Sequence, residues 1–101
     1  MIKIRIGSTV QLVMELQYED GTPLDLTNVT EITLYLKDIS TGEEVYSGAC
    51  TIISASDGII SHTWSDTTTL SGVYEREFKL TYSDGSVDYI PSESLEYIMF
   101  W

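Results

Sequence analysis

The sequence predicts an all-β protein, built as a sandwich or small barrel of about seven or eight short strands. Three observations indicate this class. Apolar residues alternate with polar ones along most of the chain, as they do in half-buried strands. Turns that contain glycine or proline interrupt the alternation about every 8–12 residues. No window of the sequence shows a sustained helical period.

Four strands are predicted in the N-terminal half of the chain. Because their apolar residues recur at every second position, one face of each strand can enter a core. These strands cover residues 2–6, 10–18, 32–36 and 45–53. The fourth is the weakest, since small residues at 47–49 interrupt it. Between the second and third strands, the turn 19–23 leads to Leu24 and Leu26, which we expect to tuck under the sandwich.

Four more strands are predicted in the C-terminal half, over residues 60–64, 74–80, 87–90 and 95–101. A turn at 56–58 precedes the first of them, and Asp84-Gly85 between two alternating runs is the strongest hairpin signal. We expect Pro91 to break the ladder, because proline has no N–H to donate. The inward-facing residues of these strands predict a core of Leu12, Met14, Leu16, Ile32, Leu34, Leu36, Trp64, Tyr74, Phe78 and Leu80.

The size and charge of the chain exclude several classes of function. Residues 1–101 have the length of a single domain, with 16 acidic and 5 basic side chains and a formal net charge of -11. A nucleic acid or an anionic membrane surface would be repelled, so we expect neither as a partner. No apolar run is long enough to span a bilayer, and residues 1–6 lack the apolar core of a signal peptide. We therefore expect synthesis in the cytoplasm.

Two side chains could carry catalysis. His62 could be a general base or a metal ligand, but it shares a strand face with Ile60 and Trp64 and is the only histidine. We expect it to be a core histidine packed beside Trp64. Cys50, the only cysteine, lies in an uncharged stretch that would not activate a thiol, so we expect a buried, small apolar residue. The sequence thus predicts no catalytic residue and no enzyme.

Acidic residues are abundant, in pairs at 19–20 and 43–44 and at Glu75 with Glu77. Acid–base catalysis needs two carboxyl groups in unequal environments within a cleft, so we interpret these as solvated surface acids. Several loop aspartates could bind calcium, but none has the spacing of a dedicated calcium loop. These aspartates are Asp20, Asp25, Asp57, Asp66 and Asp84. We expect no metal and no cofactor.

The segment 95–101 is apolar on both faces up to the last residue. Such a strand must be covered on both faces, either by another chain or by the domain's own loops. Both alternatives remain open at this point. If another chain covers one side, the candidate interface residues are Tyr97, Ile98, Phe100 and Trp101.

Tyr74 follows Gly72 at the start of a predicted strand. At such a corner a tyrosine hydroxyl can bond to a nearby backbone group. We therefore interpret Tyr74 as a structural residue rather than as a ligand contact.

The order of these signals resembles the immunoglobulin-like N-terminal domain of phage baseplate upper proteins and related small phage tail proteins. The matching segments are 10–16, 20–27, 29–36, 57–60 with Trp64, 66–67, 72–78 and 84–85. Together they cover nearly the whole chain, and their motifs are structural. The resemblance implies an immunoglobulin-like, two-layer antiparallel β-sandwich.

The resemblance favours a non-enzymatic structural component of a phage or prophage particle. As a tail, baseplate or head-surface protein, the chain would act through protein–protein contacts with other virion proteins, and it could also form a homo-oligomer. Its expected location is the virion. The alternative is a module that binds carbohydrate or a host surface, because Tyr35, Tyr46 or Tyr89 could stack on sugars.

Overall fold

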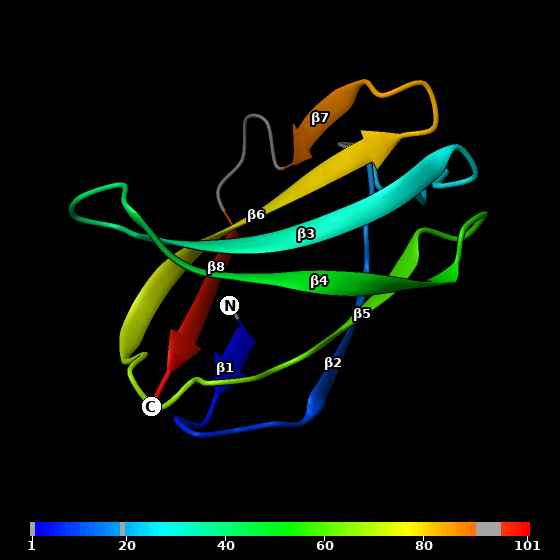
Figure 1. Cartoon of the computed structure of the whole chain (residues 1–101). Helices are drawn as coiled ribbons and strands as arrows, with labels where there is room; N and C mark the ends of the chain where they lie inside the picture. The colour runs from blue at the N-terminus through cyan, green and yellow to red at the C-terminus, as the bar shows by residue number, and fades with distance from the viewer. Residues whose placement is uncertain (1, 19, 91–95) are drawn as a thin grey trace.

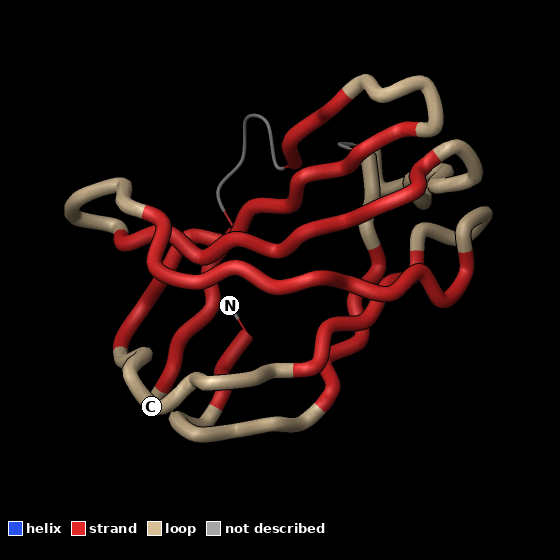
Figure 2. Tube along the Cα trace, viewed as in Figure 1, coloured by secondary structure: helices blue, strands red, loops and turns tan. Residues whose placement is uncertain are grey.

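The structure is a computed structural model that describes residues 2–18, 20–90 and 96–101. It contains eight β-strands and, within the described residues, no helix (Figures 1 and 2). The strands are β1 (Ile2–Ile4), β2 (Gln11–Glu15), β3 (Val29–Asp38), β4 (Glu44–Ser54), β5 (Ile59–Thr63), β6 (Gly72–Tyr82), β7 (Val87–Ile90) and β8 (Glu96–Phe100). The predicted all-β class is confirmed.

All eight strands belong to one sheet, which curls into a half-barrel (Figure 1). The order of neighbours is β1-β8-β6-β3-β4-β5-β2, and β7 also pairs with β6. The curl arises at β4, whose N-terminal half pairs with β3 and whose C-terminal half pairs with β5. A register shift between Ile52 and Ser54 accompanies the pairing with β5. Such irregularities bend a strand, so β4 can serve both halves.

The expectation of an antiparallel arrangement throughout is wrong at one pair. β1 runs parallel to β8, with Ile2 opposite Ile98 and Ile4 opposite Phe100, so the sheet is mixed. Almost the whole chain lies between these two strands, which removes the usual obstacle to parallel pairing, a connection too short to cross over. Alternation of apolar residues is the same in parallel and antiparallel edge strands, and it could not reveal this direction.

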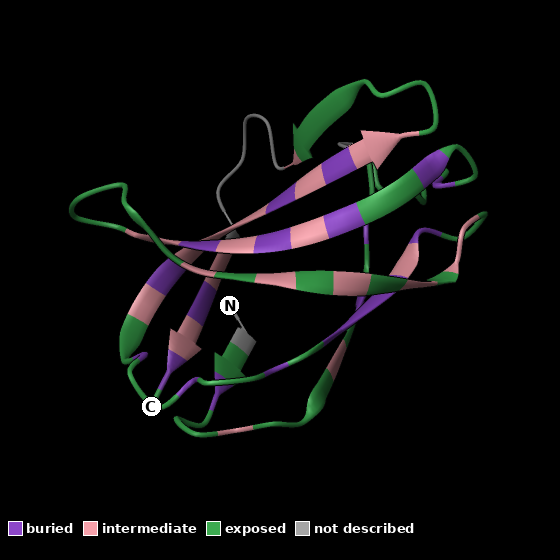
Figure 3. Ribbon diagram, viewed as in Figure 1, coloured by how far each residue is buried: buried purple, intermediate pink, exposed green. Residues whose placement is uncertain are grey.

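The core lies on the concave side of the sheet, and along most of β3 and β6 buried residues alternate with half-buried ones (Figure 3). All predicted core residues are buried except Leu12, which packs against the core and is partly buried. Leu24 and Leu26 are buried as predicted. The core also contains Ile98 and Phe100 from β8.

The tight turn between β4 and β5 lies against the segment that follows β2. Gly58 has φ of 65° and accepts a hydrogen bond from the N–H of Leu16 at 2.8 Å. A Cβ at this position would lie 2.6 Å from the Leu16 carbonyl oxygen and 2.7 Å from that of Leu24. Only glycine therefore satisfies both the conformation and the space at this turn.

Strand boundaries differ from the prediction mainly at ends and turns. The second predicted strand, 10–18, is confined to Gln11–Glu15, and Gln17 instead forms an isolated bridge with Pro23. The hairpin at Asp84-Gly85 is confirmed, with the Tyr82 N–H bonded to the Ser86 carbonyl. Pro91 and Leu95, which figured in the predicted ends of two strands, lie outside the described residues.

Candidate functional site

His62 lies where β4 and β5 diverge. The ladder between them begins at Thr51 and Ser61, and the earlier part of β4 pairs with β3 instead. The imidazole of His62 spans the resulting gap. Its Nδ1 is 2.9 Å from the Ala49 carbonyl oxygen, and its Nε2 is 2.7 Å from the Tyr46 hydroxyl. The ring therefore joins the two halves of the sheet through side-chain hydrogen bonds.

These two contacts define one tautomer of His62. A carbonyl oxygen can only accept, so Nδ1 carries the proton and donates to Ala49, and Nε2 accepts from the Tyr46 hydroxyl. Burial lowers the pKa of His62, although its bond to the Ala49 carbonyl opposes this shift. The ring is thus neutral near pH 7, with both nitrogens engaged.

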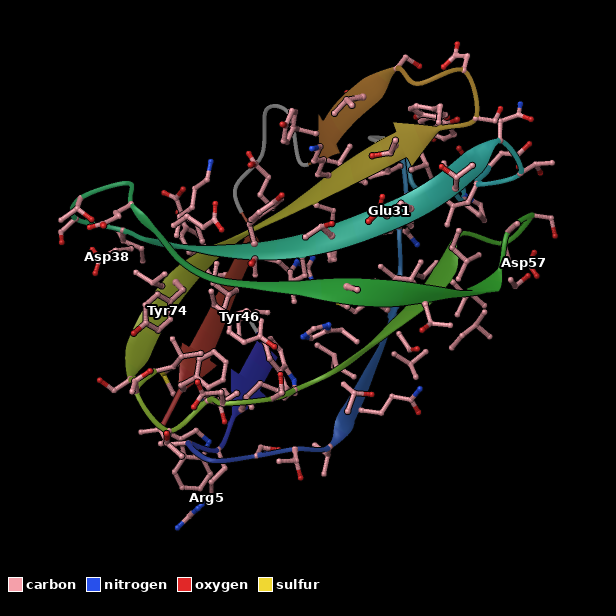
Figure 4. All side chains as sticks on the ribbon, viewed as in Figure 1. Arg5, Glu31, Asp38, Tyr46, Asp57 and Tyr74 are labelled. Atoms are coloured by element: carbon pink, nitrogen blue, oxygen red, sulfur yellow. The ribbon has the colours of Figure 1, made fainter. Side chains whose placement is uncertain are left out.

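Aromatic rings surround this histidine. His62 and Trp64 pack edge to face with centroids 4.9 Å apart, and Tyr46 lies 5.4 Å from Trp64. Phe100 packs edge to face against Trp64 at 5.3 Å. Figure 4 shows Tyr46 projecting from β4 into the interior of the half-barrel. The prediction that His62 packs beside Trp64 in the core is confirmed. Tyr46, one of the three tyrosines that could stack on sugars, is half-buried, and its hydroxyl and ring contact this cluster.

Gly48 makes room for the histidine. A Cβ on this residue would lie 2.4 Å from Cε1 of His62 and 3.3 Å from the Tyr46 hydroxyl oxygen. The small residues that weaken the strand signal at 47–49 therefore have a packing function, since one of them seats the imidazole.

Cys50 is a partly buried residue that packs against the core from β4. Burial raises the pKa of its thiol to about 12. The thiolate is the nucleophilic form, so this sulfur is protonated and unreactive at neutral pH. Its predicted role as a small apolar residue agrees with this environment.

Four aspartates, three in loops and one at the end of β3, share one local motif, in which a serine or threonine follows two positions later. In each, the carboxylate accepts from both the backbone N–H and the hydroxyl of that residue, and these bonds lower the pKa of the aspartate. The pairs are Asp20 with Thr22, Asp25 with Thr27, Asp38 with Ser40 and Asp84 with Ser86. These carboxylates stabilise their own turns.

The loop acids do not converge on one site. Asp38 and Asp57 lie at opposite ends of the sheet (Figure 4). Among the described residues, no group of three His, Cys, Asp or Glu side chains is arranged to hold a metal ion. Glu75 and Glu77 lie on the convex face of β6, where Glu77 forms an ion pair with Lys37 at 3.1 Å.

The four candidate interface residues on and after β8 divide into two pairs. Ile98 and Phe100 are 0% and 1% exposed and belong to the domain's own core. Tyr97 is half-buried on the opposite face of β8. Trp101 is 56% exposed, and the Arg5 guanidinium lies 4.5 Å from its ring centroid. The two faces of this segment thus have different environments, and only Tyr97 and Trp101 remain accessible to a partner.

Two tyrosines from the predicted sugar-binding set lie on the convex face of the sheet. Tyr35 is opposite Glu77 on β6, and Tyr89 on β7 is opposite Lys79. Since Glu77 and Lys79 are two residues apart on one strand, the tyrosines flank them diagonally. Tyr89 is 47% exposed, on a strand that is largely exposed (Figure 3).

A shallow pocket lies between the β2–β3 connection and the β6–β7 turn. Its lining is formed by Asn28, Tyr82, Ser83, Asp84 and Ser86. The Asp84 carboxylate is occupied by its own turn, and the Ser83 N–H donates to the Asn28 carbonyl at 2.8 Å. The lining groups therefore mainly bond to one another.

Sequence reasoning missed the stacking of Arg5 on Trp101 and the accessible edge of β2. The first brings together residues from the two ends of the chain, through a parallel strand pair that no local pattern indicated. The second had a partial signal in Gln11, Val13 and Glu15, the polar or exposed positions of an alternating strand.

Comparison with known proteins adds no identification. No protein-family model matches the chain, and no curated protein is similar to it in sequence. The described residues include no helix long and apolar enough to cross a membrane.

Proposed function

We propose that this chain is a non-enzymatic structural component of a phage or prophage particle, built on an immunoglobulin-like β-sandwich and acting through protein–protein contacts. The observation that carries the proposal is the pattern of strand neighbours, taken with the hydrogen bond at Tyr74. Both support an immunoglobulin-like arrangement, which is the fold that the resemblance to phage baseplate and tail domains implies.

The strand neighbours support an immunoglobulin-like arrangement. In such a sandwich, strands lettered in chain order form one sheet A–B–E–D and a second sheet C–F–G. Here β2, β5 and the C-terminal half of β4 have the neighbours of B, E and D. β3, β6 and β8 have those of C, F and G. In this interpretation β4 passes from one layer to the other, and β7 is an addition to the second layer.

The tyrosine of the corner also supports it. Tyr74 lies near the start of β6, and its hydroxyl oxygen accepts a hydrogen bond from the Ser71 N–H at 3.1 Å. A tyrosine that bonds to the backbone a few residues upstream is typical of strand F in these sandwiches.

Surface composition favours contacts with other proteins. Large apolar side chains are exposed on several strands and loops of the described part of the chain, and those that adjoin one another could contribute to a contact with another protein. The exposed residues are Ile6, Val10, Val13, Tyr18, Ile39, Val45, Ile53, Val87, Tyr89 and Trp101. Because this chain has a net charge of -11, we expect a heterologous partner to be basic, or at least less acidic than this chain.

Mass spectrometry of purified particles from the producing host tests this proposal. We expect the chain at a constant ratio to the other virion proteins through successive density gradients, and antibody labelling at one location on the particle. Its absence from intact particles, with abundant soluble protein in the same lysate, would overturn the proposal.

A second function, binding of carbohydrate, is favoured by Tyr35 and Tyr89 on one sheet face. Aromatic rings stack on the apolar faces of sugars, and the neighbouring Glu77 and Lys79 could bond to hydroxyl groups. Glycan-array binding that is lost in both Tyr35→Ala and Tyr89→Ala, but retained in Tyr18→Ala, would support this alternative over the first.

A further inference from the structure

The outer edge of β2 has accessible backbone groups. On the β5 side, the Leu16 N–H donates to the Gly58 carbonyl at 2.8 Å, and the Val10 carbonyl accepts from the Trp64 N–H at 3.4 Å. At each end of β2, an even-numbered residue thus points a backbone group toward the segment of β5 and its flanking residues, whereas the Leu16 carbonyl accepts from the Leu24 N–H at 2.8 Å. Because these directions alternate in an antiparallel ladder, Gln11, Val13 and Glu15 point their N–H and C=O groups away from it. We call these outward groups the β2 edge.

No described strand pairs with the β2 edge. The side chains beside it are accessible, since Gln11 and Glu15 are exposed and Val13 is 56% exposed. The strand pairs with β5 without a register shift, so no bulge turns the edge away. Unpaired, regular edges of this kind are templates for another strand.

The other edges carry protective features that the β2 edge lacks. On β7, the Asp88 carboxylate accepts from the Tyr89 N–H at 2.9 Å. On the free side of β4, the Ala49 carbonyl is occupied by His62. β1 has only three residues, and the Arg5 carbonyl that follows it accepts from the Ser8 N–H at 3.0 Å. Blocking side chains and short edge strands suppress edge-to-edge pairing.

The convex face next to the β2 edge is nearly uncharged, although the chain as a whole has a net charge of -11. Alternation along the paired strands places on it Gln11, Val13 and Glu15 of β2, Ile59, Ser61 and Thr63 of β5, and Thr51 and Ile53 of β4. Glu15 is the only ionisable group in this set. Two copies of so acidic a chain can approach most closely here, because fewer like charges come together.

We infer that the β2 edge pairs with the same edge of a second copy of this chain. Antiparallel pairing of one strand with its own copy has two-fold symmetry, so both copies contribute the same residues. A register centred on Val13 uses the whole strand. It places Val13 opposite Val13, and Gln11 of each copy opposite Glu15 of the other.

The registers shifted toward either end are poorer. A centre at Glu15 would place the two carboxylates directly opposite each other, which is destabilising. A centre at Gln11 would leave the C-terminal residues of both strands unpaired. In the Val13 register, the Gln11 amide can donate to the Glu15 carboxylate across the pair twice.

A five-residue strand pair buries little area, so the dimer is weak in solution and gains strength where many copies are held together. Its association strengthens with salt, because screening reduces repulsion between the acidic chains. The inference does not depend on whether the chain belongs to a particle, since it concerns the purified protein alone.

Sedimentation equilibrium of the full chain at high protein concentration, in low and high salt, tests the inference. We expect a monomer–dimer equilibrium that shifts toward dimer with salt. Val13→Lys places like charges opposite each other at the two-fold axis and should raise the dissociation constant at least about tenfold. The control Val87→Lys alters an exposed valine on β7 and should leave the constant within about twofold.

Cross-linking of Val13→Cys gives a second measurement, which remains informative even if Val13→Lys does not fold. Paired backbones place the two Cα atoms at about 5.5 Å, within disulfide range, so mild oxidation should yield covalent dimers. Val87→Cys should not cross-link, and Cys50 is the same in both variants. Monomeric wild-type protein under all conditions, dimerisation of Val13→Lys like wild type, or equal cross-linking of both cysteine variants would each overturn the inference.

Discussion

Tyr74 and His62 illustrate how single polar residues act inside this fold. Both side chains are buried, at 9% and 3% exposed, and each bonds to a backbone group of a neighbouring segment. The Tyr74 hydroxyl bonds to the loop before its own strand, whereas the ring of His62 on β5 bonds to the neighbouring strand β4. A buried polar group is costly without a partner, so each position tolerates few replacements.

Replacement of Tyr74 by phenylalanine should lower the free energy of unfolding by about 1 kcal/mol, the net contribution of one buried hydrogen bond. The Ser71 N–H loses its acceptor while the ring packing is kept. Urea denaturation measures the change, with Tyr89→Phe on the exposed strand as the matched control. An unchanged midpoint in Tyr74→Phe would contradict the structural role of this hydroxyl.

The stability of the protein should fall as the pH decreases below about 6.5, the ordinary pKa of histidine. Burial lowers the pKa of His62 in the folded state, so the unfolded chain binds a proton more readily in this range. The contribution of His62 to stability is complete at pH values above the pKa of this residue in the unfolded chain. It decreases as the pH falls toward the lower pKa of His62 in the folded state. Thermal unfolding between neutral and mildly acidic pH measures this dependence.

His62 is the only histidine, which makes the assignment direct. The variant His62→Gln, measured over the same pH range, should lose the dependence even if it is less stable throughout. An equal slope in wild type and variant would show that another group is responsible.

At the level of elements, β8 shows how pattern and environment can differ. Its sequence is apolar on both faces, which indicated cover by a second chain or by the domain itself. The core covers one face, where Ile98 and Phe100 are buried, and the other face has half-buried Tyr97 and Met99 between β1 and β6. The next residue, Trp101, extends the contact with β1 and stacks on Arg5.

Truncation of Phe100 should therefore destabilise the fold much more than truncation of Trp101. Phe100→Ala should lower the free energy of unfolding by about 3–5 kcal/mol, because it leaves a cavity beside Trp64. Trp101→Ala should cost much less, because this ring is largely exposed.

Denaturation and pull-down with particle proteins separate the two effects. If Trp101 contacts a partner, Trp101→Ala should weaken incorporation into particles while the midpoint of unfolding changes little. A large loss of stability in Trp101→Ala with incorporation unchanged would assign this residue to the domain alone.

For the whole molecule, charge opposes compaction. Sixteen acidic and five basic side chains share one small domain, so most acids have no basic side chain to pair with. Folding brings the acids closer together than they are in the unfolded chain, and this repulsion destabilises the folded state. The hydrogen bonds within the turns lower the pKa of four aspartates and so favour their charged form, but they do not remove the repulsion between the acidic side chains.

The thermal unfolding midpoint should therefore rise as sodium chloride is added, because salt screens repulsion between surface charges. Differential scanning calorimetry at low protein concentration, where association is negligible, measures this shift. Neutral sucrose of equal osmolality provides a comparison for effects unrelated to charge. A midpoint that falls with salt would indicate that attractive pairs dominate instead.

The sequence alone determined the all-β class, the predicted core and the hairpin at Asp84-Gly85, because these depend on local alternation and on turn residues. Alternation reports which side of a strand is buried, and it carries no information about which strand lies beside it. It therefore could not predict the parallel pairing of β1 with β8 or the shared use of β4.

Only the tertiary structure placed the residues of interest. The partners of His62 come from β4, and Arg5 meets Trp101 from the other end of the chain. The sequence carried only a partial signal for the β2 edge, because the availability of this edge depends on which strands lie beside β2. Strand pairing joins segments that are distant in the chain. This long-range pairing determines which polar groups are buried, which are hydrogen-bonded and which backbone groups stay accessible at an edge.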